Sequence, residues 1–300
     1  MQIADCGLKK PGRVRSANLQ SAIRNPQFPM PPPIKLSSPA TKEFWEIPVL
    51  HEDAQLLAVD KPVGLLVSPD RSDAARPSLL RLLNEGIVRG VPWARERGLA
   101  YLANAHRMGF ENSGVLLLAK SKPILVALAG QSGAARPVEC HVALVRGSPE
   151  ADEFTVAERV GRHQFHSDLM RVDPVRGKPC STKFTVLERF KRWTLLKCQP
   201  LTGGVDHQIR VHLSHADLSV AGDAAYGGKQ LLLSTFKTSY RLKPGQEERP
   251  LISALALHAE SLSLAHPVTG TALHITAPWP RDLRVAVKYL RLYAQETGGA

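Results

Sequence analysis

From about residue 45 onward, short strand-forming segments outnumber helical ones, and brief turns separate them. Residues 138–144 alternate apolar and polar side chains, which is typical of a half-buried strand. Residues 114–119 form a continuous apolar run, which indicates a fully buried strand. Helical spacing is confined to residues 78–88, 123–130, 209–215 and 283–294. This pattern predicts an α+β fold with a mixed, mainly antiparallel sheet and flanking helices.

Residues 1–44 differ from the rest of the chain in charge and in proline content. Up to residue 42, seven Lys and Arg stand against a single acid, Asp5. Six prolines between residues 26 and 39 interrupt any regular element. We therefore expect a basic, disordered tail over residues 1–44 and one folded domain over residues 45–296. The tail is interpreted either as a solvated segment or as an arm that contacts nucleic acid. The prolines argue against a third interpretation, a mitochondrial presequence.

The net charge points to a polyanionic partner. Lys plus Arg number 39 against 27 Asp plus Glu, so the 300-residue chain carries a formal charge of +12. Excess positive charge favours phosphate contacts, because these release counterions. Half of the excess lies in residues 1–42, so the predicted domain is only moderately basic. An apolar content of 43% excludes wholesale disorder.

The cysteines and the hydropathy indicate a cytoplasmic protein. Four cysteines, Cys6, Cys140, Cys180 and Cys198, are scattered without any Cys-x-x-Cys pair. This spacing argues against a zinc site and against a dense disulfide framework, and it favours a reducing compartment. Apolar runs fall far short of the roughly 20 residues that a membrane span needs. We expect no membrane association.

Two segments concentrate polar residues within apolar surroundings, residues 105–114 and residues 201–213. The first contains His106 and Arg107, and the second contains His207 and Arg210. Such loops at the ends of strands or helices can contact phosphate or form a catalytic wall. They can equally hold structural ion pairs and helix caps. On residue types alone, the structural interpretation is favoured.

Residues 106–114, His-Arg-Met-Gly-Phe-Glu-Asn-Ser-Gly, resemble the His-Arg-Leu-Asp-x-x-Thr-Ser-Gly motif of RluA-type RNA pseudouridine synthases. The segment His-Gln-Ile-Arg-Val-His-Leu at residues 207–213 resembles the second motif of that family. Further agreement in order and spacing extends over residues 56–65, 222–227 and 257–280. The resemblance covers roughly residues 48–292. It implies a pseudouridine-synthase-like domain that isomerises uridine to pseudouridine in structured RNA, ribosomal or transfer RNA, without a metal or nucleotide cofactor.

The resemblance also implies roles for individual residues. In this family the Asp of the first motif is the catalytic carboxylate, which acts as nucleophile or base. Arg107 matches the Arg beside the flipped base, and Arg210 matches the Arg that pairs with the Asp. His141 stands where a Tyr packs against the base, and an imidazole can still stack there. The resemblance places RNA contacts at His106, Arg107, His207, Gln208 and Arg210.

The position of the catalytic Asp is occupied by Gly109, which can be neither nucleophile nor base. Glu111 and Asp206 are weak substitute candidates. Two residues of extended loop span up to about 7 Å, so a catalytic Glu111 would require the loop to rearrange. Asp206 belongs to a second motif that is one residue longer than the family pattern. We expect Asp206 or Glu111 to neutralise Arg210, since an unpaired buried Arg is costly.

Three functions remain open after this comparison. The favoured one is an RNA-binding family member whose catalysis is impaired. The second is an active synthase that uses Glu111 or Asp206. The third is a protein–protein interaction module whose basic tail binds an acidic partner.

Overall fold

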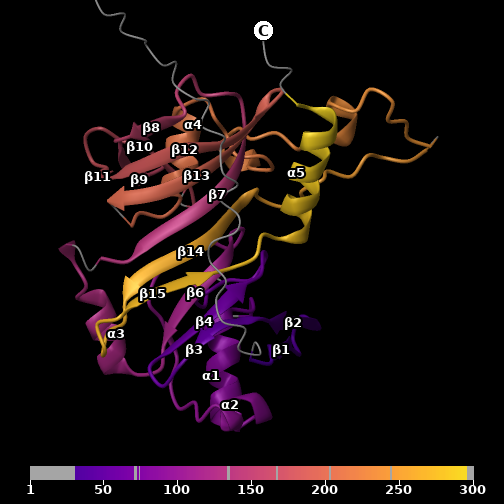
Figure 1. Cartoon of the computed structure of the whole chain (residues 1–300). Coiled ribbons are helices and arrows are strands. Elements are labelled where there is room, and N and C mark those ends of the chain that lie inside the picture. The colour runs from indigo at the N-terminus through magenta and orange to yellow at the C-terminus, as the bar shows by residue number, and fades with distance from the viewer. Residues whose placement is uncertain are drawn as a thin grey trace, which may run out of the picture. The chain divides into compact units, whose positions relative to one another are not determined.

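The computed structural model describes residues 31–295, except 71, 72, 74, 134, 135, 167, 203 and 244. Ten strands form its main sheet: β3 (Val49–Glu52), β4 (Leu56–Lys61), β5 (Ala103–Asn104), β6 (Ser113–Ala119), β7 (Val138–Arg146), β8 (Glu153–Val156), β12 (Ser181–Phe190), β13 (Trp193–Thr202), β14 (Leu257–Ala265) and β15 (Ala272–Thr276). Eight of them follow the order β3-β4-β6-β14-β7-β13-β12-β8, while β15 pairs with β14 and β5 with β6. Only β6 and β14 pair in parallel within this sheet. The predicted fold class is confirmed (Figure 1).

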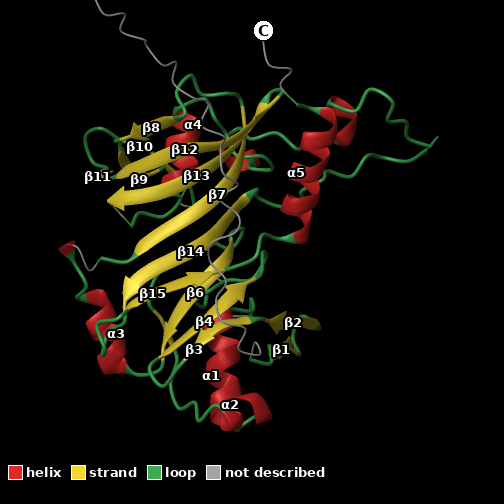
Figure 2. Cartoon of the chain, in the orientation of Figure 1, coloured by secondary structure: helices red, strands yellow, loops and turns green. Residues whose placement is uncertain are grey.

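Helices cover the sheet and lie at its ends (Figure 2). They are α1 (Leu79–Arg89), α2 (Pro92–Glu96), α3 (Lys122–Ala129), α4 (Gln208–His215) and α5 (Arg281–Tyr293). The short 3₁₀ helices η2 (Ala224–Tyr226) and η3 (Leu233–Thr235) follow α4. Leu283 and Leu290 of α5 and Leu213 of α4 share one core cluster with β7 and β13. This packing fixes the beginning of α4 against the centre of the sheet.

The folded region begins before the expected boundary at residue 45. β1 (Ile34–Ser38) and β2 (Glu43–Ile47) form an antiparallel hairpin. Ile34 and Leu36 are buried beside α1, so apolar alternation prevails over the neighbouring prolines. The expectation of a disordered tail is therefore wrong for residues 34–44. Residues 1–30 lie outside the described part of the chain.

A smaller sheet lies at the opposite end of the molecule from α1 and α2 (Figure 1). It consists of β9 (Arg159–Arg162), β10 (Met170–Val172) and β11 (Lys178–Pro179), with β9 in the middle. Val160 of this sheet and Cys180, which directly follows β11, form one hydrophobic cluster with Val211 of α4. This contact places the smaller sheet over α4.

The turn after β4 leads into residues 65–68, which form no strand; Leu66 only forms an isolated bridge with Ser78. Within the described ranges, no helix has the length and apolarity to cross a membrane.

Candidate active site

The loop of residues 105–112 connects β5 to β6 and is fixed by three contacts. The Ala105 N–H donates to the Leu117 carbonyl oxygen at 2.8 Å. His106 Nε2 accepts the Leu117 N–H at 3.1 Å. The Gly64 N–H donates to the Phe110 carbonyl oxygen at 2.9 Å. His106 thus lies against the strand backbone, although the sequence suggested an RNA contact.

Gly114 fixes the end of this loop, where β6 runs parallel to β14. Its φ is +111°, in the left-handed region that favours glycine. A Cβ at this position would collide with the carbonyl oxygen of Ala259. The close approach of the two strands therefore requires glycine and holds the loop at the centre of the sheet.

The backbone at residue 109, in contrast, does not require glycine. Its φ lies outside the left-handed region, and a Cβ would meet its nearest neighbours, Asn112 Cγ and Glu111 Oε2, at 3.8 Å. These are ordinary van der Waals distances. A Cβ at residue 109 would therefore fit, close to the Glu111 carboxylate and the Asn112 side chain.

Arg210 is 5% exposed and forms a bidentate pair with Asp223. Its Nε and Nη2 donate to the Asp223 carboxylate at 2.8 and 2.6 Å. Its Nη1 lies 3.5 Å from Glu111 Oε2. Burial alone would lower the pKa of Arg210, but the hydrogen bonds and charge of Asp223, together with Glu111, raise it. Glu111, which was expected to be a possible main partner of Arg210, is thus only a minor one, and the main partner, Asp223, was not foreseen.

Asp206 lies beside Arg107 and is not the partner of Arg210. The distance from Arg107 Nη1 to Asp206 Oδ1 is 3.5 Å, and the two side chains are 79% and 55% exposed. The expectation that Asp206 neutralises Arg210 is wrong, because Asp223 occupies both donors on that side of the guanidinium. Arg107 instead pairs with Asp206 at the surface, where its side chain is accessible to a ligand.

His207 and Gln208 begin α4 and are held by other parts of the site. His207 Nδ1 lies 2.8 Å from Tyr226 Oη, and the Tyr226 ring stacks 4.7 Å from the Arg210 guanidinium. Burial and the charge of Arg210 lower the pKa of His207. Gln208 is buried, and its Nε2 donates to Ser181, Thr182 and Thr202. Gln208 therefore braces β12 and β13, and its side chain does not form part of an open RNA surface.

His141 is 7% exposed and lies on β7, between Cys198 of β13 and Ala259 of β14. Burial lowers its pKa, against the opposing charge of Glu139, and the neighbouring His106 adds to the lowering. Among the described residues, its Nδ1 has no hydrogen-bond partner. His141 is therefore a neutral imidazole at ordinary pH, with one ring nitrogen unused.

Comparison with known proteins places this geometry in a family. The family model described as RNA pseudouridylate synthase matches residues 55–215, which include both polar loops. This chain belongs to the RNA pseudouridylate synthase family. It resembles the ribosomal large subunit pseudouridine synthases D of Nitrosomonas europaea and Xanthomonas campestris. The first is 35% identical and spans 83% of this chain and 67% of that protein. The second is 32% identical and spans 81% and 69%.

Two solved human structures share the fold of this RluA-type family member. Human RNA Pseudouridylate Synthase Domain Containing 4 is 23% identical, with a TM-score of 0.58 over 81% of this chain and 92% of that one. Human RNA Pseudouridylate Synthase Domain Containing 1 is 20% identical, with a TM-score of 0.56 over 84% and 97%. At these identities the likeness establishes the architecture alone.

Lys61 is a further site residue that the sequence did not single out. It is fully buried at the end of β4, and its Nζ donates to the carbonyl oxygens of Pro62 and Leu65 at 2.8 Å. Burial lowers the pKa of Lys61 to about 7, against the opposing charges of Glu111 and Asp60. Lys61 therefore stabilises the turn that contains Gly64. The Gly64 N–H in turn binds the loop of residues 105–112.

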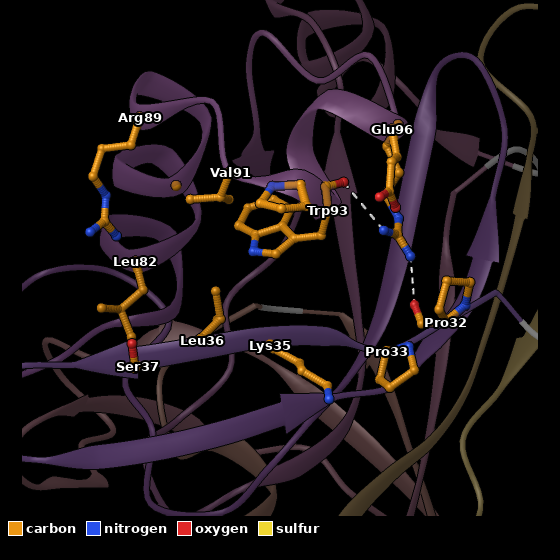
Figure 3. A pocket seen from close by; sticks show the side chains of 13 residues that line it. Pro32, Pro33, Lys35, Leu36, Ser37, Leu82, Arg89, Val91, Trp93 and Glu96 are labelled. Carbon is orange, nitrogen blue, oxygen red and sulfur yellow. Dashed lines mark hydrogen bonds between the residues drawn. The ribbon is translucent and has the colours of Figure 1, made fainter.

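A separate cavity of about 460 Å³ lies between β1, α1 and α2. Figure 3 shows Trp93, Leu36 and Leu82 around it. The Arg97 guanidinium donates to the carbonyl oxygens of Trp93, on α2, and of Pro32. The predicted site residues do not line this cavity, so it is distinct from the candidate active site.

Proposed function

We propose that this chain is an RNA-binding member of the RluA-type pseudouridine synthase family in which isomerisation is strongly impaired. The observation that carries this proposal is the glycine at residue 109, where the family motif has its carboxylate. The neighbouring Arg210 is already satisfied by Asp223, so the site remains folded without that carboxylate.

The chemistry explains the impairment. Forming pseudouridine breaks the bond between N1 and the ribose, joins C5 to the ribose and releases the C5 proton. A carboxylate assists as nucleophile or base, and Gly109 supplies neither. Arg107 and Arg210 match the family motifs, and such binding groups can leave residual activity.

The proposed partner is ribosomal RNA of the large subunit. The net charge of +12 and the names of the two bacterial relatives support this choice. The target uridine would leave its stack to reach Arg107 and the loop, at a cost of a few kcal/mol.

Incubating the wild-type chain with large-subunit ribosomal RNA, followed by detection of pseudouridine, tests the proposal. We expect RNA binding that weakens steeply with salt, together with little pseudouridine. Multiple turnover by the wild type would overturn the impairment. Absence of salt-dependent RNA binding would overturn the proposed function and favour a protein partner.

One observation favours a second candidate, a synthase that uses Glu111. The Glu111 Oε2 lies 3.8 Å from the place of a Cβ on residue 109 and 3.5 Å from Arg210 Nη1. Its side chain is 46% exposed and so accessible. In this case Glu111→Gln would abolish pseudouridine formation while RNA binding persisted, and the matched Asp206→Asn variant would remain active.

A further inference from the structure

The smaller sheet is tied directly to the candidate active site through Tyr226. The N–H of Met170, on β10, donates to Tyr226 Oη at 2.9 Å. The same hydroxyl lies 2.8 Å from His207 Nδ1, and the Tyr226 ring stacks on Arg210. One side chain therefore joins β10 to the beginning of α4. A ligand held beside β10 would lie one aromatic ring away from Arg210.

A groove of about 470 Å³ lies on the β10 side of Tyr226. Its lining includes Arg171 and Met170 of β10, His215 of α4, and His163 before the β9–β10 turn. The volume falls within the range of small-molecule sites, which is the size class of a single nucleotide. Cationic and imidazole groups beside an aromatic ring suit a phosphate and a base.

The turn between β9 and β10 exposes an aromatic side chain beside His163, which lines this groove. Phe165 is 84% exposed, and its N–H donates to His163 Nδ1 at 3.2 Å. The His163 ring lies 6.3 Å from the Phe165 ring and 4.9 Å from the His166 ring. Three rings thus gather on one short turn. Exposed aromatic rings of this kind are platforms on which unpaired bases stack.

The charge of the smaller sheet agrees with an RNA ligand. Residues 158–178 contain five Lys and Arg against three acids. Arg159, Arg162 and Arg176 are exposed. The Asp173 carboxylate is bound by Arg171 at 3.1 Å and by the N–H groups of Val175 and Arg176. The exposed charge is therefore mainly positive.

We infer that the groove between β10 and α4, with Phe165 at its rim, binds an unpaired nucleotide that flanks the target uridine. Phe165 stacks on the base, and Arg171 and Arg162 contact the phosphates. This inference rests on the proposed RNA-binding function. It assigns part of the affinity to a surface outside the two polar loops.

Binding of a fluorescein-labelled RNA stem–loop with uridines in its loop, measured by anisotropy over a salt series, tests the inference. Phe165→Ala should weaken binding by about 5- to 150-fold, since stacking contributes about 1–3 kcal/mol per base. Phe165→Trp should restore it. The matched control is Phe44→Ala, because Phe44 is also exposed (58%) but lies on β2. Phe44→Ala should bind as the wild type does.

A second pair of variants tests the phosphate contacts. Arg162→Gln should lower the slope of log affinity against log salt by about one, and Arg89→Gln on α1 should leave it unchanged. Wild-type binding that Phe165→Ala and Arg162→Gln do not alter would overturn this inference and leave the proposed function intact. Failure of the wild type to bind RNA would overturn both.

Discussion

The guanidinium of Arg210 is held by the carboxylate of Asp223 through two hydrogen bonds, of 2.8 and 2.6 Å. Both groups are buried, and the remaining nitrogen, Nη1, faces Glu111 at 3.5 Å. The pair lets the site stay folded without a carboxylate on residue 109. The fold of the site therefore does not depend on the carboxylate that would carry out the chemistry.

Removing the Asp223 carboxylate should therefore destabilise the fold. Asp223→Asn leaves a buried Arg210 without its counter-charge, which should lower the free energy of unfolding by about 3–5 kcal/mol. Urea denaturation measures this change. Asp206→Asn breaks an exposed pair with Arg107 and should cost less than about 1 kcal/mol. Equal losses in the two variants would contradict this account of Arg210.

Buried Lys61 should make the free energy of unfolding depend on pH in the neutral to alkaline range. Its pKa is about 7 in the folded chain and near 10.5 when unfolded, so between these values the unfolded chain holds an extra proton. The free energy of unfolding should rise with pH by up to about 1.4 kcal/mol per unit from this group. Lys61→Met should lose that slope between pH 7 and 9.5. Parallel pH profiles for the variant and the wild type would count against a buried, neutral Lys61.

His258 should make the free energy of unfolding depend on pH on the acid side of neutrality. It lies on β14 with Nδ1 2.9 Å from Ser113 Oγ, and burial lowers its pKa to about 4, against the opposing hydrogen bond to the Ala277 carbonyl oxygen. Between pH 6.5 and 4 the unfolded chain binds a proton here that the folded chain does not. Stability should therefore fall as pH falls, by up to about 1.4 kcal/mol per unit. Thermal unfolding of His258→Gln should show a flatter acid limb; an unchanged limb would refute this assignment.

Local periodicity predicted most of the elements that position the site. The apolar run before residue 119 became β6, the alternation from Val138 became β7, and the second motif became α4. β1 was missed because prolines around it outweighed the alternation of Ile34 and Leu36. Composition therefore placed the domain boundary too late.

The contacts within the site were harder to predict, since they depend on tertiary structure. Asp223 reaches Arg210 from a turn 13 residues away, and nothing in the spacing identifies it as the partner. In an extended loop, Glu111 would lie up to about 7 Å along the chain from residue 109. The Asn112 N–H instead turns back to the Gly109 carbonyl oxygen at 3.3 Å, which brings Glu111 close to residue 109.

We propose that the carboxylate missing from residue 109 limits the reaction. Joining C5 of uracil to the ribose releases the hydrogen on C5, so tritium release from RNA labelled at that carbon reports the chemistry directly. The comparison is between the wild type, Gly109→Asp and Gly109→Asn, whose side chain has the same size without the charge. We expect Gly109→Asp to release tritium roughly 100-fold faster than the other two, or more. A wild-type rate equal to that of Gly109→Asp, or no advantage of Asp over Asn, would contradict the account.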